Sequence, residues 1–276
     1  MAAGSEKTTS TDPTTAAIRA NYSRVATTYA GQWAETLAHH GRALAERLLP
    51  DGRALRWVGE VGCGPGLVLA DLERLAPDAR VVGIDLTEEM LHQAPTRFDR
   101  VAADAQALPF RSGTLDAVLM PFVLFHVPDL PLALSEVRRT LAAGGSFGAV
   151  TWFEHDPHQA YQVWVEVIDE YGAPPDPAPQ MPSHAVTSDP GKLEIALQTA
   201  GFGSIEITVE RFHHHPTAAR FLAHSQVIGA MARRIEQLPS DRRTACLAAA
   251  ERELSRLEPD AFIESGTVLY VTATAT

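Results

Sequence analysis

The chain has 276 residues, of which 45% are hydrophobic and 21% charged, a balance typical of a globular protein with a substantial core. Its formal net charge is −11 and it has no dense run of Lys and Arg, which disfavours nucleic acid or an anionic membrane surface as a partner. Its two cysteines, Cys63 and Cys246, argue against a disulfide framework and favour the cytoplasm. No apolar run reaches the roughly 18 residues of a membrane-spanning helix, so we expect none.

The N-terminal residues are rich in Ser, Thr, Ala and Gly and lack the apolar stretch of a secretory signal, which predicts a disordered tail over residues 1–15. Residues 16–276 form a single predicted domain. Its first part, residues 15–49, is predicted to be helical because aromatic residues, among them Tyr22 and Tyr29, recur there at helical spacing.

Short apolar runs then predict five strands, separated by stretches with the 3.6-residue spacing of helices. The predicted strands cover residues 57–61, 80–84, 101–103, 115–120 and 146–152. The helix before the fifth strand is predicted to begin at Asp129, a suitable N-cap, and to end at Gly144 and Gly145. This alternation of strand and helix predicts a parallel sheet with helices on both faces.

The last part of the chain departs from that alternation. Apolar and polar residues alternate over residues 205–210, which predicts a half-exposed strand, and residues 268–271 form a second strand. Two helical stretches lie between these strands. We found no internal repeat.

The central motif joins the first strand to the following helix and reads Glu60-Val61-Gly62-Cys63-Gly64-Pro65-Gly66. Glycines in such a turn permit positive φ and close approach of a ligand to the backbone. The G-x-G-x-G spacing is one residue shorter than the G-x-G-x-x-G dinucleotide fingerprint, which disfavours a nicotinamide enzyme. A tight turn without a ligand is the alternative.

Three further features lie at the ends of later strands. Asp85 ends the second strand, where a carboxylate is placed to accept hydrogen bonds from both hydroxyls of a ribose. Asp104 follows the third strand and is placed to accept from an adenine amino group. The fourth strand ends in Met120-Pro121-Phe122, where main-chain atoms reach a ligand. We expect these residues to converge, because ligands of open α/β sheets bind outside the carboxyl ends of the strands.

Taken together, these segments resemble the class I S-adenosylmethionine (SAM)-dependent methyltransferases. The resemblance includes the branch of ubiquinone and menaquinone C-methyltransferases and many natural-product methyltransferases. It covers residues 20–152 well and the chain from residue 193 more loosely. It implies an α/β, Rossmann-like sheet of seven strands, with the last strand antiparallel beside the fifth, helices on both faces and helical lid insertions.

The resemblance also implies a cofactor, SAM, with S-adenosylhomocysteine as its product. The glycine turn would approach the methionine part with Glu60 behind it, Asp85 would bind ribose, and Asp104 would face adenine. Tyr22 and Tyr29 lie where the family's N-terminal helix closes over the cofactor, although packing against the sheet is an equal alternative. The implied cofactor-binding residues are Tyr22, Tyr29, Glu60, Gly62, Cys63, Gly64, Gly66, Asp85, Leu86, Met90, Asp104, Ala105 and Met120.

The acceptor is expected to contact the variable segments, residues 153–190 and 216–264, which suit a lid over an apolar pocket. His126 follows the fourth strand and is a candidate general base, or alternatively an anchor for the next helix. The histidines of residues 155–158 and 213–215 match no dedicated ligand spacing, so no metal site is predicted.

The function predicted from these features is transfer of the methyl group of SAM to a small-molecule acceptor, in natural-product or quinone-type biosynthesis. The alternative is an enzyme of the same fold that keeps SAM and catalyses a cyclisation or isomerisation without methylation. A non-enzymatic SAM-binding partner is a further alternative. The identity of the acceptor, the methylated atom and the oligomeric state stay open.

Overall fold

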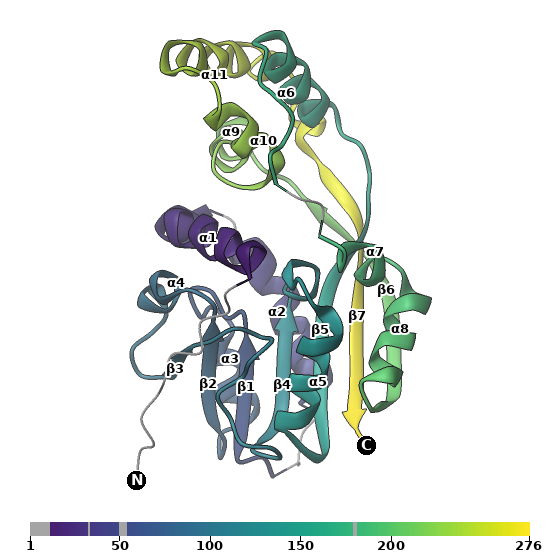
Figure 1. The fold of residues 1–276 in the computed structure, drawn as a ribbon. Helices are drawn as coiled ribbons and strands as arrows, with labels where there is room; N and C mark the ends of the chain where they lie inside the picture. Colours follow the sequence, from purple (N-terminus) through teal and green to yellow (C-terminus); the bar gives the residue numbers. More distant parts are fainter. Residues whose placement is uncertain (1–11, 33, 50–53, 179–180) are drawn as a thin grey trace.

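The computed structural model describes residues 12–32, 34–49, 54–178 and 181–276. Within these residues the chain forms one seven-stranded sheet with the order β3-β2-β1-β4-β5-β7-β6, which Figure 1 shows edge to edge. The strands are β1 (Trp57–Val61), β2 (Arg80–Asp85), β3 (Asp99–Ala102), β4 (Leu115–Pro121), β5 (Leu141–His155), β6 (Phe202–His214) and β7 (Glu264–Ala275).

Strands β1 to β5 pair in parallel, whereas β7 pairs antiparallel with both β5 and β6. β7 therefore lies between β5 and β6 and runs against all the other strands. The predicted Rossmann-like sheet with an antiparallel last strand beside the fifth is confirmed. Because the parallel strands end at a common edge, the residues that follow β1, β2, β3 and β4 meet there.

Helices cover both faces of the sheet, as predicted. Leu44 of α2 and Leu72 of α3 pack in the apolar core on one face, and Leu134 of α5 and Leu197 of α8 pack in the core on the other. The helices are α1 (Pro13–Gln32), α2 (Ala34–Leu48), α3 (Leu69–Leu75), α4 (Glu88–Gln93), α5 (Leu130–Thr140), α6 (Gln159–Glu170), α7 (His184–Thr187), α8 (Pro190–Thr199), α9 (Ala218–Ser225), α10 (Gly229–Glu236) and α11 (Ser240–Leu254), with 3₁₀ turns η1 (Leu124–His126) and η2 (Pro259–Phe262). Among the described helices, none has the length and apolar character that a membrane crossing requires.

A third apolar core lies outside the sheet, in what we call the helical module: α6, α9, α10, α11 and η2. Trp164 of α6 and Cys246 of α11 are fully buried in it, beside Phe221 of α9. In Figure 1 the module stands beyond the carboxyl end of β5 and is joined to the sheet by the long strands β5, β6 and β7. Large parts of the two variable segments predicted as a lid therefore fold together into one unit, whereas α7, in the first segment, packs against η1 and α8.

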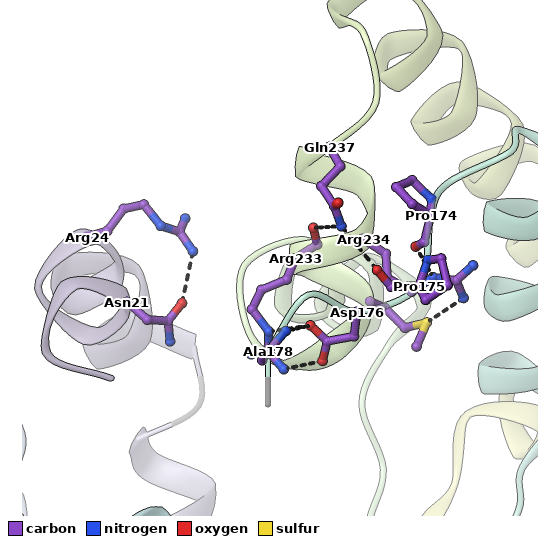
Figure 2. A network of polar contacts seen from close by, with 10 residues as sticks. Asn21, Arg24, Pro174, Pro175, Asp176, Ala178, Arg233, Arg234 and Gln237 are labelled. Carbon is purple, nitrogen blue, oxygen red and sulfur yellow. Dashed lines mark hydrogen bonds and ion pairs between the residues drawn. The ribbon is translucent and has the colours of Figure 1, made fainter. Parts of the chain in front are cut away.

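Polar contacts tie the module together (Figure 2), and an ion pair connects it to α1. Arg233 of α10 donates to both carboxylate oxygens of Asp176, at 2.8 and 2.6 Å. On α1, Arg24 donates to Asn21 at 3.2 Å and forms a 2.7 Å ion pair with Glu236 of α10. The module thus reaches back to the N-terminal helix.

The N-terminal boundaries differ from those predicted. α1 begins at Pro13, so the last residues of the predicted 1–15 tail are helical, while residues 1–11 lie outside the described part of the chain. The predicted helix over 15–49 is divided into α1 and α2.

The boundary between α5 and β5 also differs. α5 ends at Thr140 rather than at Gly144 and Gly145, because Leu141 already has extended dihedrals and pairs with Leu115 of β4. The register between β4 and β5 then shifts, and Gly144 takes a φ of 70° in this irregular stretch. The glycines serve a bulge in the strand rather than a helix end.

Candidate active site

The glycine turn follows β1 at the carboxyl edge of the sheet. Gly62, Gly64 and Gly66 have φ values of 73°, 52° and 71°, in the region that residues with a Cβ rarely adopt. A Cβ on Gly62 would collide with the Val123 side chain, and one on Gly66 would lie 2.9 Å from the Cβ of Ala94. The nearest atom to a Cβ on Gly64, a ring carbon of Tyr29, is 3.9 Å away. Only Gly64, of these three, faces open space.

That space is a cavity of about 800 Å³, which we call the main cavity. It lies over the ends of β1 to β4 and under α1. Ten residues singled out from the sequence line it: Tyr22, Tyr29, Gly62, Gly64, Asp85, Leu86, Met90, Asp104, Ala105 and His126. Pro121 and Phe122, which end the predicted fourth strand, line it as well. Other lining residues were not expected from the sequence, among them Thr15, Ile18, Thr87 and Val123.

A smaller cavity of about 380 Å³ adjoins the main cavity, and Tyr29, Gly62, Gly64 and Phe122 line both. Glu60 and Cys63 contribute to this adjoining cavity, and α2 closes its far side. All but two of the predicted cofactor-binding residues therefore line one or both of these cavities.

Those two are Gly66 and Met120, which line neither cavity. Position 66 requires a glycine, because its φ is positive and because Leu69 and Ala94 leave no room for a Cβ. Met120 is fully buried between the sheet and its helices, and its neighbours Pro121 and Phe122 form the cavity wall instead.

Asp85 lies at the end of β2 and is buried. One carboxylate oxygen, Oδ1, accepts from the backbone N–H of Thr87 at 2.9 Å and from its hydroxyl at 3.0 Å. The other, Oδ2, accepts from the backbone N–H of Gly64 at 2.9 Å. Burial raises the pKa of this carboxyl, and the hydrogen bonds from Thr87 and Gly64 oppose the rise. Thr87 also caps α4, so Asp85 links the glycine turn to that helix.

Asp104 is held by a residue that the sequence analysis did not identify. Gln106 donates to the Asp104 carboxylate from its backbone N–H, at 2.9 Å, and from its side-chain amide, at 3.1 and 3.2 Å. The same amide reaches the hydroxyl of Thr15 at 3.4 Å, and its oxygen accepts from the backbone N–H of Asp129 at 3.0 Å. Gln106 thus joins α1, the β3 end and the start of α5 around one wall of the main cavity.

Glu60, behind the glycine turn, is a buried acid. Its Oε2 atom has no hydrogen-bond partner among the described residues, and burial, followed by the charges of Asp85 and Asp71, raises its pKa to about 8. Burial also raises the pKa of the neighbouring Cys63 thiol. A buried carboxyl of this kind favours a proton or a cation beside it.

His126 lies in the η1 turn, and its Nε2 is 2.8 Å from the hydroxyl oxygen of Tyr22. The rings of Tyr22 and Tyr29 meet edge to face at 5.9 Å between centroids. Burial, then the charges of His184 and Arg233, lower the pKa of His126 to about 4, so its imidazole is neutral at neutral pH. Asp129 caps α5 by accepting from the backbone N–H of Leu132, so the predicted N-cap is correct and that role does not fall to His126.

A third cavity, of about 1280 Å³, lies between the helical module and the extended ends of β5, β6 and β7. We call it the module cavity. Its walls include Trp152, Tyr161, Phe212 and Phe221, with Glu264 at the start of β7. It is formed entirely by the two variable segments and the strand ends beside them.

Comparisons with known proteins agree with this architecture. The family described as "Methyltransferase domain" matches residues 59–149. The chain is 28% identical to malonyl-[acyl-carrier protein] O-methyltransferase from Dechloromonas aromatica, over 89% of this chain and 86% of that protein. It is 30% identical to demethylmenaquinone methyltransferase from Roseiflexus castenholzii, over 56% of this chain and 69% of that protein. Among solved structures, the [4+2]-cyclase SpnF shares the fold, with a TM-score of 0.53 and 19% identity over 95% of this chain and 97% of that chain.

The strand order and the glycine turn at the end of β1 define a Rossmann-like methyltransferase fold. The chain belongs to the SAM-dependent methyltransferase family, as the resemblance of its motifs predicted. It is therefore a methyltransferase whose cofactor is SAM.

Proposed function

We propose that this enzyme transfers the methyl group of SAM to a small organic acceptor, and that the main cavity with its smaller neighbour holds the cofactor. The observation that carries this proposal is the convergence of Gly64, Asp85 and Asp104 around one cavity, although each follows a different strand. The likeness to a demethylmenaquinone methyltransferase supports an acceptor of quinone or natural-product type. The two buried free cysteines, Cys63 and Cys246, fit a reducing compartment such as the cytoplasm.

The carboxylate of Asp85 fits a ribose, with one change from the expectation. A carboxylate offers about four acceptor positions. Thr87 fills two and Gly64 a third, so Oδ2 keeps one position for a ribose hydroxyl. We therefore propose one direct hydrogen bond to the ribose from Asp85, rather than the two anticipated from the sequence.

The adjoining cavity fits the methionine end of SAM. That end carries an ammonium group and a sulfonium. Glu60 supplies a buried carboxyl whose Oε2 atom has no hydrogen-bond partner among the described residues. A cation beside Glu60 would favour its ionised form. The open space in front of Gly64 leaves room for a ligand to approach the backbone closely.

Adenine is assigned to the other end of the main cavity, beside Asp104 and Ala105. Gln106 occupies part of the Asp104 carboxylate and fixes its orientation. Leu86 and Met90 provide apolar surface on the opposite side, and Met90 is almost fully buried. A planar, largely apolar base with an amino group suits this combination.

Bound SAM supplies an activated methyl group, so the protein contributes mainly position and the exclusion of water. His126 and Tyr22 add a route for a proton. Since Nε2 of His126 is engaged with the Tyr22 hydroxyl, a proton from the acceptor would pass to the imidazole through that hydroxyl. Neutral His126 is able to receive it.

Incubation of the enzyme with SAM and a panel of phenol, quinol and amine acceptors tests the function, with S-adenosylhomocysteine as the readout. Consumption of an acceptor without this product would favour the cyclisation or isomerisation alternative. Asp85→Asn tests the cofactor site. We expect its SAM dissociation constant to rise by roughly 10- to 100-fold, because a hydrogen bond to a charged buried group is worth about 1.5–3 kcal/mol.

The matched control is Asp99→Asn. Asp99 is an acid on the neighbouring strand β3, and it pairs at the surface with Arg80. The Asp99→Asn variant should bind SAM with the same affinity as the unmodified enzyme. If Asp85→Asn also binds SAM with unchanged affinity in calorimetry, Asp85 does not contact the cofactor.

A further inference from the structure

The module cavity combines aromatic side chains with carboxyl groups. Aromatic rings make much of its wall, with Trp152 and Phe212 at 5.4 Å between ring centroids and Phe221 beside the ring of His158 at 5.6 Å. Tyr161 is 44% exposed and also lines the space. Ring faces of this kind attract apolar groups and cations.

The charges around the cavity are unbalanced. Among the described residues that line it, none is Lys or Arg, and two are carboxylates, Asp156 and Glu264. Asp156 is compensated, because it pairs with Arg211 and accepts from the hydroxyl of Ser265 at 2.8 Å. Glu264 is not compensated: in the described part of the chain its carboxyl has neither a hydrogen bond nor an ion pair.

The remaining titratable groups of the wall do not supply the missing positive charge. Burial lowers the pKa of His155 and of His158, and it lowers that of His224 to about 4, so these imidazoles favour the neutral form. Burial also raises the pKa of the half-buried Glu264 to about 7, as expected for an acid removed from water without a cation beside it.

The cavity adjoins the cofactor site. The ring of Trp152 packs against that of Phe122, with 4.5 Å between centroids, and Phe122 lines both the main cavity and its smaller neighbour. Phe122 has a φ of 58°, unusual for a residue with a bulky side chain and costly unless its surroundings hold it there. The Phe122–Trp152 pair therefore lies where the two spaces meet.

We propose that the module cavity is the acceptor site and that it takes an organic molecule carrying a basic amine, with the ammonium group against Glu264 and the rest of the molecule between the aromatic rings. This inference rests on the proposed function, because it assigns the acceptor of that reaction. A carboxylate or phosphate would meet no cation on this wall and would face Glu264 directly. The amine is the group that is recognised, and the methylated atom lies at the other end of the molecule, which reaches the main cavity.

The test measures binding of three probes of similar size to the whole enzyme without SAM: 2-phenylethylamine, 2-phenylethanol and 3-phenylpropionate. Calorimetry should give the amine the lowest dissociation constant, by about tenfold or more relative to the alcohol, and the carboxylate the highest. Equal binding of amine and alcohol, or tightest binding of the carboxylate, would overturn the proposal.

Substitutions identify the residues that produce the preference for the amine over the alcohol. Glu264→Gln should reduce the amine-to-alcohol ratio to about one, whereas Glu258→Gln, an exposed acid at the start of η2, should leave the ratio unchanged. Tyr161→Leu should weaken amine binding several-fold while Tyr161→Phe preserves it, and the exposure of Tyr161 makes both compatible with folding. If Glu264→Gln keeps the preference, Glu264 is not the recognition group.

SAM affinity, measured by calorimetry in the same variants, separates this inference from the proposed function. Glu264→Gln should bind SAM as the unmodified enzyme does. Failure of the unmodified enzyme to bind SAM would contradict the proposed function and leave the amine result standing. SAM binding without any amine preference would contradict only the acceptor assignment.

Discussion

Gly64 differs from the other two glycines of its turn because a cavity, rather than a side chain, lies in front of it. We expect Gly64→Val to fold but to lose SAM affinity by at least about 100-fold, since its side chain would occupy cofactor space. Forcing a residue with a Cβ into the left-handed region costs roughly 1–2 kcal/mol, so the variant should also melt earlier. Calorimetry with SAM and a thermal melt measure the two effects.

Gly113→Val provides the control for backbone strain. Gly113 has a φ of 69°, and the nearest atom to an added Cβ there is 4.0 Å away, in a turn that lines none of the three cavities. It should lose stability to a similar degree and keep full SAM affinity. Normal SAM binding by Gly64→Val would remove the glycine turn from the cofactor site.

Glu60 gives the stability of the enzyme a pH dependence. Its folded pKa of about 8 exceeds the ordinary value of about 4.3, so the folded state keeps a proton that the unfolded state releases. The free energy of unfolding without SAM should therefore fall as pH rises from about 5 to about 8. Glu60→Gln should show a shallower fall, by on the order of 1.4 kcal/mol for each pKa unit of the shift.

Denaturant unfolding at pH 5.5 and at pH 7.5 measures this difference. Glu251→Gln, an exposed acid on α11, is the control and should keep the pH slope of the unmodified enzyme. An unchanged slope in Glu60→Gln would mean that the Glu60 carboxyl titrates alike in the folded and unfolded chains.

The Tyr22–His126 pair predicts a particular pH profile. An unperturbed histidine would give a kinetic limb at about pH 6.5, but burial moves the expected limb to about pH 4. Turnover should fall as pH drops through that value, because protonated His126 no longer accepts a proton. Tyr22→Phe and His126→Ala should each lower turnover by ~10²-fold or more and change SAM affinity only a few-fold.

The double variant should be no slower than either single variant, because the two residues act as one unit. Steady-state rates between pH 3.5 and 8 with the identified acceptor provide the measurement. Native turnover in His126→Ala, or a limb near pH 6.5 in the unmodified enzyme, would contradict the proton route.

At this scale the sequence located Asp85, Asp104 and the glycine turn, because each follows a strand in a recognisable local pattern. It did not locate Gln106, whose side chain joins three segments of the chain. A glutamine has no local signature for such a role, since its partners become neighbours only after folding. The missing partner of Glu60 is likewise a property of burial that spacing does not reveal.

Among the elements, α10 links the two variable segments through hydrogen bonds. Besides the bidentate pair between Arg233 and Asp176, Arg234 donates to the carbonyl of Pro174 at 2.8 Å and to that of Ala173 at 2.9 Å. These bonds join residues 57 to 61 positions apart in the chain. Figure 2 shows Arg233 and Arg234 beside Asp176 and Pro174. The sequence predicted two lid segments and gave no sign that they form one unit, because their contacts depend on side chains distant in sequence.

This coupling changes the design of a segment exchange. Replacing residues 153–190 alone by the matching part of a related enzyme would remove Asp176 and leave Arg233 without its partner, so we expect lower stability. Replacing 153–190 together with 216–264 should transfer acceptor preference and leave SAM affinity within a few-fold. Product analysis, SAM calorimetry and thermal melts measure the three properties, and a joint exchange that keeps the original acceptor preference would contradict the assignment.

For the molecule as a whole, the regular α/β part could be predicted and the helical module could not. The alternation of strand and helix indicated the parallel sheet, and the family resemblance supplied the position of the antiparallel strand. The ion pair between Arg24 and Glu236 is exposed, with side chains 45% and 38% accessible, and exposed pairs contribute only about 0–1 kcal/mol. The position of the module over α1 therefore depends mainly on the continuous strands β5, β6 and β7.

The position of β7 in the sheet also determines when the sheet can be completed during synthesis on the ribosome. β7 is made after β6 but lies between β5 and β6 in the sheet, so neither strand has its shared neighbour until residues 264–275 have emerged. Until then the edges of β5 and β6 that β7 later covers are unpaired, and unpaired strand edges are prone to aggregation. The residues that line the main cavity, from Thr15 to Pro128, have by that time all been synthesised. A cellular pool of SAM that binds this early portion would stabilise it by mass action while the last strand is still to come.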